Sequence, residues 1–376
     1  MHYNIFLEKK SRQYYNGTMK KNELQYRQDV AFINRENELC DLKNFVNKRP
    51  SEILFIHGPK SSGKTTLLYK FLEQIQKEQK LDVKFMDLRK TFTNVYEDFL
   101  KAFFQVETKG EKKETLTSNI NIGFFKIDTT VERKILEKRA DPFKVMETEF
   151  LELTRGGIKP LLIIDELQAL DKVYLDNDKE RQLITALFNF FVAMTKQSHL
   201  AHIMIASSDG YFLNTIYNDS KLKKCSRFYK VDYLPKEDVI EWLLNLEKYS
   251  RIKNYTLSRE DAEKIWDVVG GSMWEIQDIL TELFEHPIDD VLAAYKQKML
   301  GMITYYIVKK GRKKREKILS HFVENDYLWA RDTSEHDEEL LGDMVTNNIL
   351  YFDPTGAVYY PQGKSFQWGI RLYFEQ

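Results

Sequence analysis

Short apolar runs alternate with amphipathic stretches through the first two thirds of the chain. Five runs predict strands, at Glu52–His57, Val83–Leu88, Leu161–Asp165, His202–Ser207 and Arg227–Tyr233. The third run is apolar without alternation, which is typical of a strand covered on both faces. Apolar residues at helical spacing separate the runs, and this order predicts a parallel sheet with right-handed crossovers. The expected fold class is therefore α/β, built on a five-stranded parallel sheet.

Two segments depart from this alternation. Residues 1–28 are polar and tyrosine-rich without clear periodicity, so we expect an N-terminal arm there. The α/β core is expected over residues 29–234, with an insertion at about 106–145. Within the insertion, residues 120–127 alternate like a surface strand, which predicts an inserted hairpin on the nucleotide domain.

The last third of the chain changes character at Pro235. From there to residue 288 the spacing predicts short helices, which we interpret as a helical lid. Residues 289–376 predict three helices and then two strands around the turn Asp353–Gly356. This is the order of a winged helix, so we expect a winged-helix-like domain at the end of the chain.

One motif lies between the first predicted strand and the helix that follows it. The residues Gly58, Pro59, Lys60, Ser61, Ser62, Gly63, Lys64 and Thr65 fit the pattern G-x-x-x-x-G-K-[ST] without a mismatch. Such a loop directs backbone N–H groups and a helix N-terminus at a bound phosphate. Lys64 is expected to reach the terminal phosphates and the Thr65 hydroxyl to hold Mg²⁺, and Thr66 is counted with the nucleotide-binding residues. The expected ligands are ATP or ADP with Mg²⁺.

A pair of carboxylates follows the third predicted strand. Asp165 and Glu166 come directly after the apolar run Leu161–Ile164. An acidic residue at the carboxyl end of a strand beside a phosphate loop can hold Mg²⁺, and the following glutamate can deprotonate the attacking water. We therefore expect Asp165 as a metal ligand and Glu166 as the general base. The alternative is that both residues cap the next helix at the surface.

Three more residues are candidates for contact with the γ-phosphate. The fourth strand ends in Ser207 and Ser208, and a polar side chain there would lie beside the strand that bears the carboxylates. The sequence does not choose between the two serines, and simple capping of the strand end is the alternative. Arg227 opens the fifth strand and could stabilise the transferred charge in its own subunit or a neighbour's. The alternative is a solvated arginine in a basic run.

Composition narrows the class of protein. The 376 residues carry 57 Lys+Arg and 57 Asp+Glu, so the chain as a whole is neutral and lacks the positive excess of a protein that coats nucleic acid. Cys40 and Cys225 match no metal spacing and predict reduced thiols. No apolar run approaches the ~20 residues of a membrane span, and the first residues have no export pattern. We expect a soluble cytoplasmic protein without a membrane partner.

Several stretches together resemble a known family. They are Phe32–Leu39, the phosphate loop, Leu161–Gln168, Ile205–Ser208 and the pair Gly270-Gly271. These stretches are similar to those of the archaeal-type P-loop ATPases, AAA-like relatives of the signal-transduction ATPases with numerous domains (STAND) and of replication-initiation ATPases. The tail also resembles the C-terminal winged helix of some members. The resemblance implies ATP binding, slow hydrolysis and a nucleotide-controlled rearrangement of the lid and the C-terminal domain.

The resemblance also assigns a role to the opening stretch, and two residues depart from the family pattern. The stretch usually reads Gly-Arg-Glu, which places Arg35 among the nucleotide-binding residues. Asn34 stands here in place of the glycine, whose backbone lies near the adenine. Met273 stands where the family often has proline after the glycine pair. Contacts to the base and the lid are therefore expected to differ from those of the family.

Three functions fit these observations: an ATP-driven switch or remodelling ATPase acting on protein partners, a DNA-binding ATPase, and an ATP-binding scaffold that barely hydrolyses. The predicted recognition helix opens with carboxylates at Glu335–Glu339, which DNA phosphates would repel. The basic cluster Lys309–Lys317 could still hold a nucleic-acid backbone from another face. We favour the switch acting on protein partners, and a nucleotide-dependent oligomer stays open.

Overall fold

A computed structural model gives the fold of most of the chain. It describes residues 32–75, 80–89, 94–106, 125–137, 139–175, 180–210, 212–213, 216, 219, 222–249, 255–309, 311–334 and 337–376. The expected N-terminal arm, residues 1–28, lies outside the described residues. None of the described helices combines the length and apolarity needed to cross a membrane.

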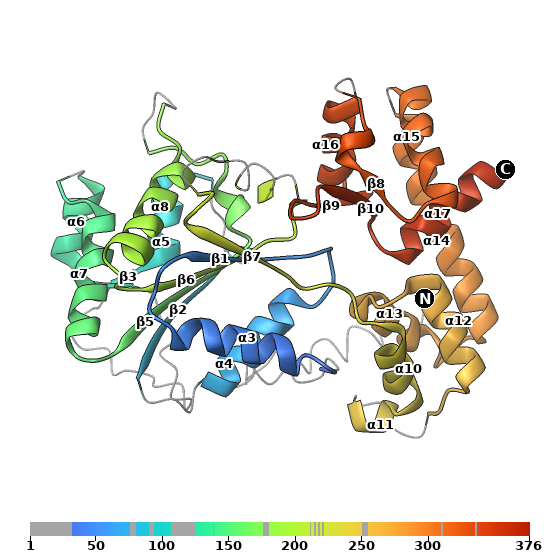
Figure 1. The fold of residues 1–376 in the computed structure, drawn as a ribbon, viewed down its shortest axis with the longest axis horizontal. Helices are drawn as coiled ribbons and strands as arrows, with labels where there is room; N and C mark the ends of the chain where they lie inside the picture. The colour runs from blue at the N-terminus through green and yellow to red at the C-terminus, as the bar shows by residue number, and fades with distance from the viewer. Residues whose placement is uncertain are drawn as a thin grey trace, which may run out of the picture.

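A five-stranded parallel sheet forms the centre of the first half of the chain (Figure 1). The strands run in the order β2-β5-β6-β1-β7, and every neighbouring pair is parallel. Their bounds are β1 Ile53–His57, β2 Leu81–Asp87, β5 Lys159–Asp165, β6 His202–Ala206 and β7 Ser226–Lys230. The predicted α/β class is confirmed, and each predicted strand is present to within three residues at either end.

Helices cover both faces of this sheet (Figure 1). The helices on one face are α3 (Glu36–Asn47) and α4 (Lys64–Ile75). The helices on the other face are α5 (Tyr96–Phe103), α6 (Thr129–Leu136), α7 (Pro142–Arg155) and α8 (Leu183–Val192), with short turns at Leu167–Leu170 and Ala193–Gln197. Leu54 and Ile56 belong to the hydrophobic cluster with α3 and α4, whereas Ile53 and Phe55 belong to the cluster on the opposite face. This explains why β1 is apolar at every position.

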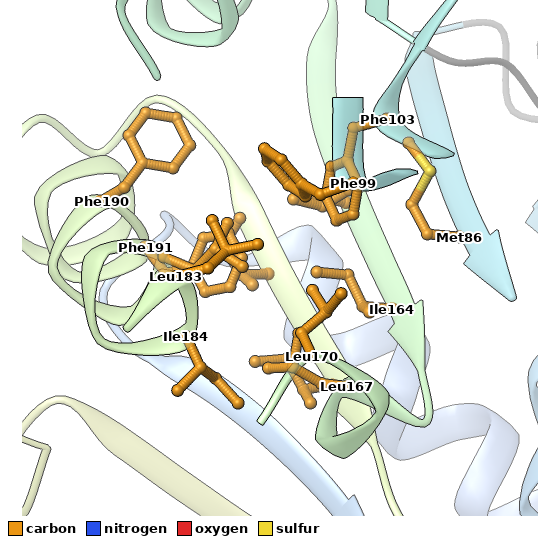
Figure 2. Packing of buried hydrophobic residues seen from close by; sticks show 14 of the residues in the cluster. Met86, Phe99, Phe103, Ile164, Leu167, Leu170, Leu183, Ile184, Phe190 and Phe191 are labelled. Atoms are coloured by element: carbon orange, nitrogen blue, oxygen red, sulfur yellow. The ribbon is translucent and has the colours of Figure 1, made fainter. Parts of the chain in front are cut away.

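Aromatic side chains fill the larger of these two clusters. Figure 2 shows Phe99 and Phe103 of α5 and Phe190 and Phe191 of α8 converging over the sheet residue Ile164. Fully burying a side chain of this size contributes about 1.5–3 kcal/mol to folding. The strand that ends in the carboxylate pair is therefore held in a tightly packed core, which fixes the position of the residues that follow it.

Two short described strands lie at the start of the predicted insertion and within it. The strands β3 (Phe104–Val106) and β4 (Phe125–Ile127) pair in parallel, with Phe104 opposite Phe125. A hairpin requires antiparallel strands, so β3 and β4 do not form one with each other. Residues 107–124, which include most of the alternating run, lie outside the described residues. The apolar faces of β3 and β4 join the aromatic cluster, which explains why the pair lies against the core.

The predicted lid consists of four helices beside the sheet (Figure 1). Their bounds are α10 Lys236–Leu244, α11 Leu246–Tyr249, α12 Arg259–Val269 and α13 Met273–Glu282. Ser258 caps α12, because its hydroxyl accepts a hydrogen bond from the backbone N–H of Asp261 at 3.1 Å. Gly270 ends α12 with φ 61°, and a side chain on Gly271 would overlap the Leu234 carbonyl. The glycine pair therefore serves helix termination and close packing.

The end of the chain packs against the lid and the sheet domain together. Its elements are α14 Ile288–Val308, α15 Arg312–Glu324, β8 Leu328–Trp329, a short turn at Ala330–Asp332, α16 Glu338–Thr346, β9 Leu350–Asp353, β10 Val358–Pro361 and α17 Lys364–Glu375. The predicted three helices and two strands are present in order, whereas β8 and α17 were not predicted. We call Ile288–Gln376 the C-terminal domain. Its first helix, α14, contributes to the lid cluster with its first half and to the C-terminal cluster with its second half.

Candidate nucleotide-binding site

The phosphate loop joins β1 to α4 at the carboxyl edge of the sheet. Gly58 passes so close to β7 that a side chain there would overlap the Val231 carbonyl. The loop is also held from outside by Arg35, which is buried and donates to the carbonyls of Ser62 at 3.2 Å and Asp232 at 2.6 Å. Arg35 therefore braces the back of the loop, and it is not among the residues that line the pocket.

The backbone conformation of Asn34 shows how this residue can stand where the family has glycine. Its φ is 47°, a left-handed conformation that asparagine tolerates better than most residues with a side chain. Its amide donates to Asp238 at the start of α10 over 2.6 Å. The residue that replaces the family's glycine therefore keeps the turn and adds a bond to the lid. Arg35 directly precedes the first residue of α3.

Lys64 is buried at the centre of the loop. Its ammonium donates to the carbonyls of Gly58 at 2.9 Å and Pro59 at 2.8 Å. Burial lowers its pKa to about 7, against the opposing attraction of Asp165. Burying a cation is costly unless charge compensates it. A bound phosphate provides that charge, so the loop holds a lysine whose charged form a nucleotide would stabilise.

Thr65 and Asp165 meet where the loop faces β5. The Thr65 hydroxyl donates to Asp165 Oδ2 over 2.8 Å. Asp165 is fully buried, and its Oδ1 is without a hydrogen-bond partner among the described residues. Burial raises the pKa of Asp165, although Arg89 and the Thr65 hydroxyl oppose the shift. A buried carboxylate oxygen beside a hydroxyl fits the oxygen ligands that Mg²⁺ prefers.

Glu166 points its carboxylate into the pocket from a strained backbone. Its φ of 63° and ψ of 48° are left-handed, which costs about 1–3 kcal/mol for a residue with a side chain. Three side chains hold the carboxylate, namely Arg89, Gln168 and the Ser208 hydroxyl, the last at 3.0 Å. The residue predicted to be the general base is thus oriented by a network, and a solvated helix cap would not need one.

Of the three residues predicted to contact the γ-phosphate, only one lines the cavity. Ser208 lines the pocket, whereas Ser207 is buried and donates to Gln168 at 2.9 Å. The structure therefore gives the two serines separate partners in one network. Arg227 is not brought to the site: it pairs with Glu52 at 2.6 Å and lies opposite Leu54, at the amino end of the sheet. Within this chain Arg227 cannot reach a phosphate bound at the carboxyl edge.

A cavity of about 830 Å³ opens above the loop and has walls from three parts of the chain. Its floor is the loop with Glu166 and Arg89. The second wall belongs to α13, and the third to the end of α16 and to Asn348, which lies between α16 and β9. The residues that line it are Lys60, Ser61, Gly63, Lys64, Thr65, Thr66, Arg89, Glu166, Gln168, Ser208, Asp209, Met273, Trp274, Gln277, Val345, Thr346 and Asn348.

Comparison with known sequences shows the family to which the chain belongs. Residues 32–279 match the profile of a family described as an ATPase domain predominantly from Archaea. The chain belongs to this family of archaeal ATPases. It is 34% identical over 347 residues to an uncharacterised ATP-binding protein of Pyrococcus abyssi, covering 92% of this chain and 98% of that protein. A second ATP-binding protein, from Methanocaldococcus jannaschii, is 40% identical over 216 residues, which is 56% of this chain and 59% of the relative.

Solved structures add support for the fold of this archaeal ATPase. A Walker-type ATPase of Pyrococcus abyssi superposes with a TM-score of 0.60 over 90% of this chain and 96% of its own, at 14% sequence identity. At that identity the likeness concerns the fold. The family assignment and the described cavity agree on the ligand class: the protein is an ATP-binding member of an ATPase family.

The C-terminal domain of this archaeal ATPase contacts the strand that leads into the loop. His57, the last residue of β1, shares a hydrogen bond of 2.9 Å between its Nδ1 and the Tyr351 hydroxyl of β9. Burial lowers the pKa of His57 to about 4, so the ring is neutral at physiological pH. Lys230 of β7 pairs with Asp353, also of β9, at 3.2 Å. Two neighbouring strands of the ATPase sheet are thus joined to one strand of the C-terminal domain.

Sequence reasoning missed several residues of the site, and one of them carried a usable signal. Arg89 follows β2, which lies beside β5, so the rule that polar side chains gather at the carboxyl edge could have found it. Trp274 is 60% exposed on α13 and lines the cavity, but nothing in its local sequence distinguishes it from a surface residue. Val345, Thr346 and Asn348 had no local signal, because only the packing of α16 brings them to the loop.

Proposed function

We propose that this archaeal ATPase hydrolyses ATP and uses the nucleotide to control the position of its C-terminal domain, acting as a conformational switch on protein partners. The observation that carries the proposal is the three-part wall of the cavity. A nucleotide on the loop would contact α13 of the lid and the end of α16 together. A ligand shifts the equilibrium between two conformations only if it makes different contacts in each of them. A nucleotide that contacts all three walls would make different contacts when the lid or the C-terminal domain changes position.

The residues that line the loop side of the cavity can be assigned to the steps of ATP hydrolysis. Lys64 would hold the terminal phosphates, and Thr65 with Asp165 would hold Mg²⁺. Mg²⁺, when bound, would neutralise charge that develops on the phosphate oxygens. Glu166 would orient and deprotonate the attacking water, once its carboxylate is released from Arg89. Ser208 keeps the carboxylate at the pocket surface during that exchange.

The contacts between domains support a switch more than a rigid ATP-binding scaffold. The His57–Tyr351 bond and the Lys230–Asp353 pair join β9 to β1, which leads into the loop, and to its neighbour β7. A shift of the loop on nucleotide binding would therefore strain a small number of polar contacts. Interfaces built from a few such contacts repack between discrete arrangements more readily than large apolar ones.

The alternative of a DNA-binding ATPase that uses its winged helix as a reader receives less support. The helix in the recognition position is α16, which has Glu338 and Glu339 in its first turn. Its last residues, Val345 and Thr346, face the nucleotide cavity. A helix used as a wall of one ligand site is not free to enter a major groove in the same conformation.

Protease cleavage of the lid tests the switch. The Glu166→Gln variant is incubated with ATP, with ADP or without nucleotide, and the cleavage rate within residues 230–300 is followed by mass spectrometry. We expect ATP and ADP to give different patterns, because only ATP places a γ-phosphate in the cavity that the loop shares with α13 and α16. The matched control is Lys64→Ala, which should bind neither nucleotide and give one pattern throughout. Identical patterns with ATP and ADP in the Glu166→Gln variant would contradict the proposal.

A further inference from the structure

A strongly basic surface lies at the turn between α14 and α15, away from the nucleotide cavity. Residues 309–317 contain seven Lys and Arg and one Glu, in a chain whose charges balance as a whole. Lys309, Lys313, Lys314 and Lys317 are all exposed. We call these four lysines, with the neighbouring Tyr305, the basic face. Figure 1 shows α15 on the outer side of the C-terminal domain, far from the ATPase sheet.

The cations of the basic face are available to a partner. Within the described residues no ion pair involves Lys313, Lys314 or Lys317, whereas their neighbours are engaged: Arg312 pairs with Glu316 at 2.9 Å, and Arg315 with Asp343 at 3.1 Å. Two of the seven cations of this segment thus serve the domain's own structure. Among the described residues, Lys313, Lys314 and Lys317 keep their charges exposed to solvent.

The placement of these lysines works against the helix that carries them. Arg312, Lys313 and Lys314 fill the first turn of α15, and the turn has no acidic residue. The amino end of a helix carries partial positive charge, so cations there destabilise it. If this face contacts only water, the unfavourable interaction between the cations and the amino end of the helix is not offset. An anionic partner would neutralise the cations, and the relief of this unfavourable interaction would favour binding.

An exposed aromatic ring adjoins the lysines. Tyr305 is 69% exposed on the last turn but one of α14, and Lys309 Nζ lies 5.0 Å from its ring centre. Lysine is depleted at the centre of protein–protein interfaces, whereas clustered lysines beside an exposed aromatic are typical of surfaces that follow a nucleic-acid backbone. The observations therefore favour a phosphodiester chain over an acidic protein.

We propose that the basic face binds the phosphate backbone of nucleic acid, without reading its sequence. This goes beyond the proposed function, because it adds a ligand that the ATPase cycle does not require. No base-reading element accompanies the face, since α16 lines the nucleotide cavity with Val345 and Thr346. Binding through phosphates alone predicts affinity that depends on salt and not on sequence.

The full-length protein with a 30-base-pair DNA duplex of mixed sequence tests the proposal by fluorescence anisotropy. If all four lysines contact phosphates, the slope of log K against log salt is about −3.6, and affinity falls about a hundredfold between 50 and 200 mM salt. The variant Lys313→Gln/Lys314→Gln/Lys317→Gln should reduce the slope by about 2.7, because three phosphate contacts are lost. A duplex of unrelated sequence should bind equally well.

A matched control distinguishes binding at the basic face from a general effect of the protein's net charge. Lys101, Lys134 and Lys172 are exposed on the ATPase domain, and changing all three to Gln alters the net charge equally. This control should bind DNA like the unmodified protein. Both triple variants should keep ATP turnover and melting temperature, which shows that they fold. The basic face is refuted if DNA does not bind at 50 mM salt, or if the two triple variants behave alike. Competition by poly-L-glutamate at the same charge concentration as DNA would also overturn the proposal, and would assign the face to an acidic protein.

Discussion

The two sides of the nucleotide cavity are built in opposite ways. The loop side is built around consecutive residues, Gly58–Thr66, whose geometry follows from glycines, a strand end and a helix start, and Glu166 and Arg89 lie beside them. The far side comes from α13 and α16, whose lining residues are separated by more than sixty positions and share no motif. The loop side holds the groups for chemistry. The far side belongs to the lid and the C-terminal domain, so the chemistry and its proposed readout lie in different parts of the chain.

The difference also appears in how each side is stabilised. The loop is anchored by buried apolar strands and by the carbonyl contacts of Arg35. The far side contacts the sheet domain through polar groups of β9 at His57 and Lys230, and Phe352 of β9 lies against the backbone of Gly210. Under the proposed switch, the nucleotide shifts the equilibrium between conformations through its contacts with both sides. Each of the following measurements tests one part of this contrast.

The largest effect is expected from Glu166→Gln on the loop side. Removing a general base typically costs about 10²–10⁴-fold in rate, while the isosteric amide keeps the packing. ATP turnover, followed by phosphate release, should fall by that factor, and ATP affinity measured by calorimetry should stay within about threefold. Glu73→Gln on the surface of α4, which removes a pair with Lys70, should change neither quantity. Undiminished turnover in Glu166→Gln would remove Glu166 from the chemistry.

The second effect concerns the proton on Lys64. Its pKa of about 7 in the free protein means that the amine is largely neutral at pH 8, whereas a bound phosphate favours the ammonium. Binding should then take up a proton, and affinity should fall as pH rises above 7, by at most about tenfold per pH unit. Calorimetry at pH 8 in two buffers with different ionisation enthalpies measures the uptake. Lys64→Arg, which keeps its charge, should lose the uptake, and an unmodified protein without uptake would contradict the prediction.

A third effect tests the contact that holds the far side in place. Tyr351→Phe removes the hydroxyl that bonds to the buried ring of His57, which should lower the free energy of unfolding by about 1 kcal/mol in urea titration. Protease cleavage within residues 230–300 should become faster without nucleotide. Tyr360→Phe on β10 is the matched control, since the Tyr360 hydroxyl forms no hydrogen bond within the described part of the chain. Equal stability losses in both variants would show that the His57 contact is not special.

The smallest effect is expected where Arg89 holds the general base. Arg89→Ala should release the Glu166 carboxylate and raise basal ATP turnover about two- to fivefold, because an ion pair with a half-exposed arginine contributes about 1 kcal/mol or less. Arg133→Ala, which removes an exposed pair with Glu137, is the control. A fall in turnover in Arg89→Ala would assign Arg89 to binding the phosphate, and would contradict its role as a restraint on Glu166.

Much of the sheet domain could be predicted from the sequence. A continuous apolar run, as in β5, identifies a strand that is covered on both faces, and the structure has a strand at each of the five predicted positions. The pair Asp165–Glu166 could be placed beside the loop, because the carboxyl ends of parallel strands meet at one edge of the sheet. The assignment of Arg227 to the site departed from that rule. Arg227 lies at the opposite edge, because the strand begins at Ser226, one residue before it.

The parallel pairing of β3 and β4 exposes a limit of sequence reasoning. An alternating apolar pattern indicates a strand with one buried face, but it does not identify the partner strand or its direction. Phe104 and Phe125 lie side by side because the aromatic core beneath them has room for both rings, at 5.8 Å between centres. Pairing direction here was settled by packing with distant residues of α7 and α8, such as Phe150 and Phe190.

The sequence by itself determined the ligand class and the catalytic candidates, because a phosphate loop is made of neighbouring residues whose backbone conformation is local. Only the tertiary structure decided that the C-terminal domain closes the cavity. That arrangement depends on α14, which runs through two hydrophobic clusters, and on α17, which packs along it. Packing of that kind sums many weak contacts between residues far apart in sequence, and no short stretch of the chain encodes it.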